Sequence, residues 1–128
     1  MTPREAGCEP DRGSATAETA VVLPVLVLLL AVALWMLGLV SAQLRCVEAA
    51  RAGARAAARG EPAEEVRSRS RAAAGPGAVV DVRLAGPVAV VEVRRRLVPP
   101  WGALARLLPA VTVGAEATVD VEPGEEAR

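Results

Sequence analysis

The sequence predicts an α+β protein: a long N-terminal transmembrane α-helix that continues into an Ala/Arg-rich helix, then a short helix and a small antiparallel β-sheet. Three observations predict it. One long run of the 128 residues lacks charge, the next segment repeats arginine at helical spacing, and the C-terminal half alternates valine with polar residues. The length suits one small domain on a membrane anchor.

The uncharged run is the strongest single feature. Every residue from Ala20 to Val40 is nonpolar, and no charge occurs from Thr19 to Leu44. A transmembrane helix needs about 20 such residues, each rising about 1.5 Å. The 69 residues from Gly60 onward are too few to wrap a buried helix of this length. We therefore expect a single membrane span, with the anchor helix covering residues 14–44.

The segment after the span predicts a continuation of the same helix over residues 45–60. Its charged residues recur every three or four positions and so form one face, while alanines dominate the other. The small alanines allow a sheet or helix to approach closely. Gly60 and Pro62 end the helix. The charged face consists of Arg45, Glu48, Arg51, Arg55 and Arg59, and it is either solvated or in contact with lipid headgroups.

The remaining residues predict a small α/β region over 61–122, followed by a charged tail at 123–128. A short helix from Glu61 to Ala74 should stop at Gly75. A hairpin should turn at Gly86-Pro87, and a last strand should bury the odd-numbered positions from Val111 to Val121. Between them, the apolar segment from Pro99 to Leu108, with Trp101, is expected to cover the sheet. The run Arg94–Arg96 marks a solvent-facing strand end or a partner-binding patch.

Composition excludes several classes of chemistry. The chain has no His and no Lys, which removes His-based acid–base catalysis, most zinc sites and Schiff-base chemistry. The net charge of zero does not favour nucleic-acid binding. We expect no enzymatic activity, no catalytic or metal-binding residue and no cofactor. The carboxylates Asp81, Glu92, Glu116, Asp120 and Glu122 are expected on polar, solvated strand faces.

The two cysteines do not predict a disulfide framework. Cys8 precedes the span and Cys46 follows it, so a membrane would separate them. Cys46 is expected to be a small buried residue, with a bridge between subunits as the alternative.

Three interpretations compete for the N-terminal segment. Val40-Ser41-Ala42 resembles a secretory cleavage site before Gln43, but the apolar run exceeds the usual h-region of about 7–15 residues. A plain, uncut signal anchor is the second. The third is a prepilin-type anchor, and the residues before the span favour it.

Those residues run from Arg12 through Gly13 and Ser14 to Glu18, directly before the apolar run. This resembles a class III, prepilin-type signal, which implies a leader of residues 1–13, cleavage between Gly13 and Ser14, and Glu18 as the fifth mature residue. Glu18 to Pro24, the Leu/Val run and the Ala/Arg helix resemble the TadE-like family of minor pilins or pseudopilins from tight-adherence (Flp-type) pilus systems. The resemblance covers about residues 12–60.

The resemblance implies a role in pilus assembly, with Glu18 acting in subunit assembly. The implied partners are a prepilin peptidase, other pilin or pseudopilin subunits, the pilus machinery and the lipid bilayer. The implied location is the cytoplasmic membrane, with the N-terminus cytoplasmic and the C-terminal region extracytoplasmic, and then the pilus. The alternative is a single-pass accessory protein of the cell envelope that binds a partner and never enters a filament.

The arginine distribution opposes that orientation. Arg4 and Arg12 precede the span, whereas four arginines follow it between Arg45 and Arg59. By the positive-inside rule, this asymmetry places the C-terminal region in the cytoplasm. The prepilin-type motif requires the reverse.

Overall fold

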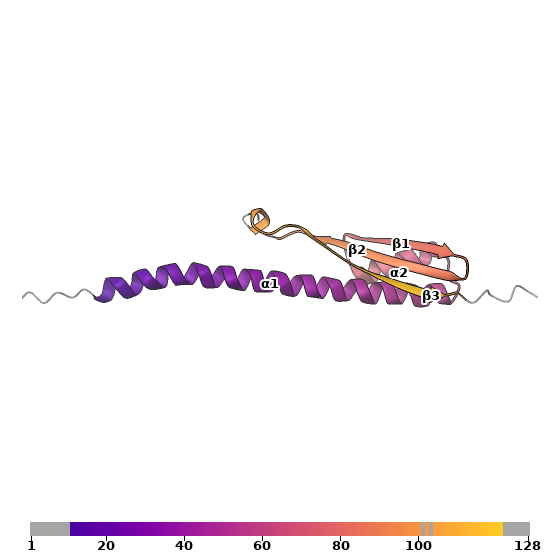
Figure 1. Ribbon diagram of the computed structural model, residues 1–128, viewed down its shortest axis with the longest axis horizontal. Helices are drawn as coiled ribbons and strands as arrows, with labels where there is room; N and C mark the ends of the chain where they lie inside the picture. The colour runs from indigo at the N-terminus through magenta and orange to yellow at the C-terminus, as the bar shows by residue number, and fades with distance from the viewer. Residues whose placement is uncertain (1–10, 101, 103, 122–128) are drawn as a thin grey trace, which may run out of the picture. The chain divides into compact units, whose positions relative to one another are not determined.

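The computed structural model describes residues 11–100, 102 and 104–121 and confirms the α+β fold class (Figure 1). The elements are two α-helices, a three-stranded antiparallel sheet and one 3₁₀ turn. The chain divides into two compact units at Trp35/Met36. The first contains the N-terminal part of helix α1, and the second contains the end of α1 and everything after it.

Helix α1 runs from Asp11 to Ala58, so the anchor and its predicted extension form one continuous helix. It contains Pro24, and residues 11–13, which the prediction placed before the helix, are helical. By length and composition, it is the one helix among the described residues that could cross a membrane. Its apolar side chains lie outside any protein core; Leu29 and Leu37 are each 65% exposed. Such a surface is suited to lipid rather than water.

Helix α2 spans Ala63–Ala74 and starts two residues later than predicted. The reason is Pro62, whose φ of −56° and ψ of 142° are extended and place it at the N-cap position. Gly75 ends the helix with φ 86°, a value that favours glycine. Every fourth residue, Val66, Ser70 and Ala74, is buried, which forms one stripe facing the rest of the unit.

The strands are β1 (Ala78–Ala85), β2 (Val88–Leu97) and β3 (Val111–Asp120), in the order β1-β2-β3. The predicted turn at Gly86-Pro87 is confirmed, because Ala85 pairs with Val88. The predicted alternation in β3 is also confirmed: its odd-numbered residues are partly buried, and three of them pair with the buried Ala89, Val91 and Val93 of β2. Val121 continues this face and packs against the core.

The core lies between the inner face of the sheet, α2 and the C-terminal part of α1 (Figure 1). The alanine face of α1 therefore covers the sheet, as the sequence predicts. By contrast, the expectation that residues 99–108 cover the sheet is wrong for the later part of that segment, although Pro99 is buried. The 3₁₀ turn η1 (Leu104–Arg106) is followed by Leu107, which is 72% exposed. Trp101 lies outside the described residues. The buried core positions are Cys46, Ala49, Ala50, Ala56, Ala57, Val66, Ala74, Val80, Ala89, Val91 and Val93.

Candidate functional site on the anchor helix and its docked sheet

The predicted processing residues lie at the start of α1. Gly13 and Ser14 have helical backbone near the first described residue of α1, and Glu18 lies directly before the uncharged run. A peptidase that requires an extended chain would therefore have to unwind α1 at Gly13.

The end of the span is tied to the sheet by Gln43. Its Nε2 donates a hydrogen bond to the Gly114 carbonyl at 2.9 Å, and the Gly114 N–H donates to Gln43 Oε1 at 3.2 Å. The amide side chain thus satisfies both backbone groups of one residue on the β3 edge, as a neighbouring strand would. No sequence pattern predicted this role for Gln43. Its only signal was a polar amide near the end of an uncharged run.

Gly53 allows the close packing of α1, α2 and β2. A Cβ atom added at Gly53 would overlap Ser70 Oγ and lie 2.9 Å from Val91 Cγ1. Ser70 is fully buried, and its hydroxyl has no hydrogen-bond partner within the described structure. Helical glycine costs stability by its propensity alone, but here the absent side chain lets three elements meet.

Cys46 is fully buried in the same core, as predicted. Burial raises the pKa of its thiol, and the nearby Arg95 guanidinium opposes this shift. A raised pKa keeps the sulfur protonated and unreactive near neutral pH. In this conformation the sulfur cannot reach another subunit.

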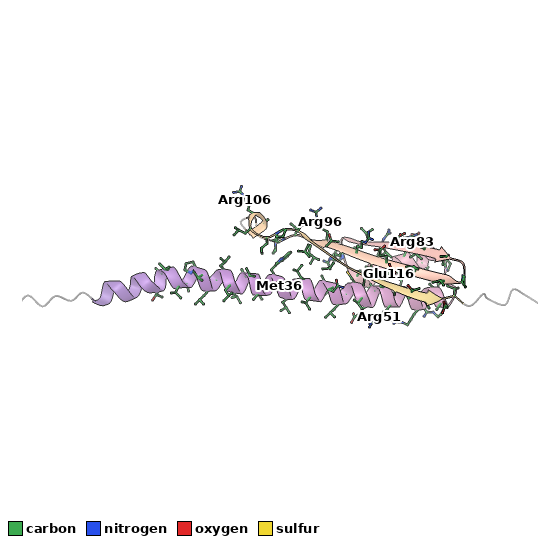
Figure 2. All side chains as sticks on the ribbon, in the orientation of Figure 1. Met36, Arg51, Arg83, Arg96, Arg106 and Glu116 are labelled. Carbon is green, nitrogen blue, oxygen red and sulfur yellow. The ribbon has the colours of Figure 1, made fainter. Side chains whose placement is uncertain are left out.

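The charged face of α1 is exposed and largely without ion pairs. Arg45, Arg51 and Arg55 make no ion pair within the described structure, and Glu48, the one acid between them, makes none either. Arg59, at the end, pairs with Glu61 at 2.6 Å. The stripe thus presents an excess of positive charge along the helix, and Arg51 marks its position in Figure 2.

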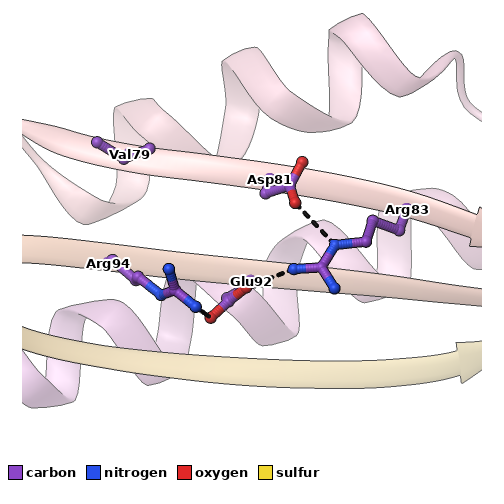
Figure 3. Close-up of a pocket in the computed structure, with 5 residues that line it drawn as sticks. All are labelled: Val79, Asp81, Arg83, Glu92 and Arg94. Carbon is purple, nitrogen blue, oxygen red and sulfur yellow. Dashed lines mark hydrogen bonds and ion pairs between the residues drawn. The ribbon is translucent and has the colours of Figure 1, made fainter.

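The outer face of the sheet carries a network of charges around a shallow depression (Figure 3). Arg83 bonds Asp81 and Glu92, each at 2.8 Å, and Arg94 pairs with Glu92. The hydrogen bond from Arg83 lowers the pKa of Asp81. In register, Asp81 faces Glu92, and Glu92 faces Glu116, so the arginines offset repulsion between like charges.

Asp81, Glu116 and Asp120 are exposed, as predicted, whereas the Glu92 side chain is only 16% exposed and pairs with Arg83 and Arg94. Exposed pairs of this kind contribute little to stability. Among the described residues, no group of three or more Cys, Asp or Glu side chains could hold a metal ion. Glu122 lies outside the described residues.

Together, these features fit a single-pass membrane protein whose apolar helix carries a small α+β region. The family model described as TadE-like protein matches residues 13–55, about one third of the chain. This match confirms the resemblance drawn from the prepilin-type motif and the helix after it, and it associates the chain with tight-adherence pilus systems. The search of curated proteins gave no match, and neither did the search of solved structures.

Proposed function

We propose that the protein is a minor pilin or pseudopilin of a tight-adherence pilus system, cut between Gly13 and Ser14 by a prepilin-type peptidase. The observation that carries the proposal is the TadE-like match, which begins at Gly13 and extends through the span to Arg55. In this proposal residues 1–13 are the leader, and the mature chain is inserted in the cytoplasmic membrane through α1. Other pilin subunits and the pilus machinery are its partners.

Glu18 supports assembly in this proposal through charge pairing. Cleavage would leave a positively charged α-amino group on Ser14. In a bundle of parallel anchors, the amine of one subunit can approach Glu18 of its neighbour. An unpaired carboxylate at the centre of an apolar layer costs roughly 2.5–3.5 kcal/mol on insertion scales. Pairing would offset such a cost and set the axial register between subunits.

The mature N-terminus tests the processing step. Intact-mass analysis of the membrane fraction should find a chain that starts at Ser14. Gly13→Arg should block cutting without blocking insertion, because the apolar run is unchanged. Gly7→Arg, a matched change upstream in the proposed leader, should be cut normally. A start at Gln43 would refute the proposal in favour of a secreted protein, and an uncut N-terminus would favour the accessory membrane protein.

A second experiment tests Glu18. Glu18→Ala and Glu18→Gln should be cut and inserted normally but should fail to enter filaments or to co-purify with other pilins. Glu48→Ala is the matched control, since Glu48 is an exposed carboxylate on the same helix with no ion pair in the described structure. Normal assembly of Glu18→Ala would refute the role in assembly and leave the Glu18 carboxylate only a favourable interaction with the helix dipole.

A further inference from the structure

Two contacts show which end of the sheet lies at the end of the uncharged run. Gly53 is level with Val91 of β2, which pairs with Ala117. Gln43, ten positions earlier in α1, is level with Gly114. The step along β3 from Ala117 to Gly114 therefore corresponds to the step along α1 from Gly53 to Gln43, which leads toward the span. All of these residues lie within the second unit.

The β2–β3 loop leaves the sheet at that end. The last register pair is Leu97 with Val111, three residues beyond Gly114 in the same direction. Gln43 is directly followed by Leu44, the last residue of the uncharged run. The loop of residues 98–110 thus starts about 10 Å closer to the span than Gln43 does, beside the last turns of the uncharged run, and a bilayer surface is expected near this end of the run.

The loop exposes apolar side chains that nothing in the described structure covers. Val98 is 59% exposed and Leu107 is 72% exposed. Leu107 is more exposed than Leu29 and Leu37 of the span, at 65% each. Single exposed apolar residues are common, but here Val98 and Leu107 lie on one loop beside the end of the uncharged run.

Arginines without counter-charges lie around this loop. Arg94 pairs with Glu92, and Arg95 Nη1 donates to the Ala74 carbonyl at 3.4 Å. Arg96 and Arg106 are exposed and make no ion pair in the described structure (Figure 2). Toward the β2–β3 loop, the last register pair of β2 and β3 that contains an acid is Glu92 with Glu116. The pairs closer to the loop, from Arg94–Gly114 to Leu97–Val111, contain three arginines and no carboxylate.

We propose that the β2–β3 loop is a membrane-contacting arm for anionic phospholipid. Val98 and Leu107 insert at the boundary between headgroups and acyl chains, and Arg96 and Arg106 bind lipid phosphates. Apolar side chains flanked by arginines are the composition that favours such interfacial binding. The inference goes beyond the proposed pilin role and requires only the membrane span. It gives the small α+β region a second attachment to the bilayer besides α1.

The test uses the full chain reconstituted in nanodiscs of equimolar phosphatidylcholine and phosphatidylglycerol. In a background with Cys8→Ser and Cys46→Ala, an environment-sensitive fluorophore is attached to Leu107→Cys. The matched control is Leu84→Cys. Leu84 is 65% exposed but lies beside the β1–β2 turn, at the opposite end of the sheet. Nitroxide-labelled lipid reports contact with the bilayer, and iodide reports contact with water.

We expect nitroxide-labelled lipid to quench the Leu107→Cys label about twofold or more above the Leu84→Cys label, with iodide showing the reverse. Arg96→Gln with Arg106→Gln, or nanodiscs of phosphatidylcholine alone, should reduce the lipid quenching. Equal quenching at both positions would overturn the proposal, since the arm would then lie in water. Protection from iodide without lipid quenching would overturn it in favour of a protein contact. If neither the Arg96→Gln/Arg106→Gln variant nor the phosphatidylcholine nanodiscs reduced the lipid quenching, the proposed binding of lipid phosphates by the two arginines would be overturned. Failure here leaves the processing proposal intact, because the mature N-terminus is measured separately.

Discussion

Replacing Gly53 by alanine should destabilise the α+β region even though alanine is the better helix former. The added Cβ would lie 2.9 Å from Val91 Cγ1, whereas unstrained carbon atoms sit about 3.5–4.0 Å apart. It would also overlap Ser70 Oγ. Val91 is fully buried on the central strand, so it has no space into which to move.

The two opposing terms set the size of the effect. Overpacking a core costs about 1–3 kcal/mol, while the change from glycine to alanine in a helix gains about 1 kcal/mol. Because the added Cβ meets two atoms at once, we place the cost in the upper part of that range, about 2–3 kcal/mol, and expect Gly53→Ala to lower the free energy of unfolding by about 1–2 kcal/mol net. Ser70→Ala should be neutral or stabilising, because it removes a buried hydroxyl that lacks a partner. The double variant should recover about 1 kcal/mol, since the overlap with Oγ is gone while that with Val91 remains.

Thiol labelling of Cys46 in increasing urea measures this, in a Cys8→Ser background that leaves one reactive cysteine. Cys46 is fully buried, so it reacts only when the core opens. Gly38→Ala is the matched control, because a Cβ there would meet no atom within 4 Å. An unchanged urea midpoint for Gly53→Ala would refute the packing argument, and so would strict additivity with Ser70→Ala.

Three further predictions concern the Gln43 hydrogen bonds, the Cys46 thiol and the orientation in the membrane. Gln43→Leu should lower the free energy of unfolding of the α+β region by about 1–3 kcal/mol, because each of the two hydrogen bonds with Gly114 contributes about 0.5–1.5 kcal/mol. A change in the urea midpoint of Cys46 labelling no larger than that of Gly38→Ala would contradict this. The free energy of unfolding, measured by circular dichroism, should fall as pH rises through and above 9.0, because the pKa of Cys46 is raised in the folded state, which therefore holds the proton to higher pH than the unfolded state. The chain has no Lys or Tyr to titrate in this range, and Cys46→Ala should remove this dependence of stability on pH. Glu125→Cys, with both native cysteines replaced by Ser, should react with a membrane-impermeant thiol reagent on intact spheroplasts, and labelling only after lysis would show that the arginine distribution determines the orientation.

The elements of the fold were predictable from the sequence because each is determined by local patterning. The length of the uncharged run suits a membrane span, the spacing of the arginines every three or four residues suits a helix, and the alternation in β3 suits a strand. The errors are local as well: Pro62 delays α2, and the segment around Leu107 is exposed rather than buried. The prepilin-type motif at Gly13 and Glu18 was found by sequence alone, and its cleavage remains a prediction.

Contacts between elements could not be predicted in this way, because they depend on which residues meet across long sequence separations. Periodicity marks Gly53 as a weak helical position, but only the packing of α1 against Ser70 and Val91 makes it necessary. The pairing of Gln43 with Gly114 joins residues 71 positions apart, and no local pattern specifies it. The sequence by itself determined that the protein has a membrane anchor, an alanine face and an amphipathic sheet. Tertiary structure alone decided how the helix docks on that sheet and which arginines remain unpaired, since docking geometry depends on the shapes of both surfaces together.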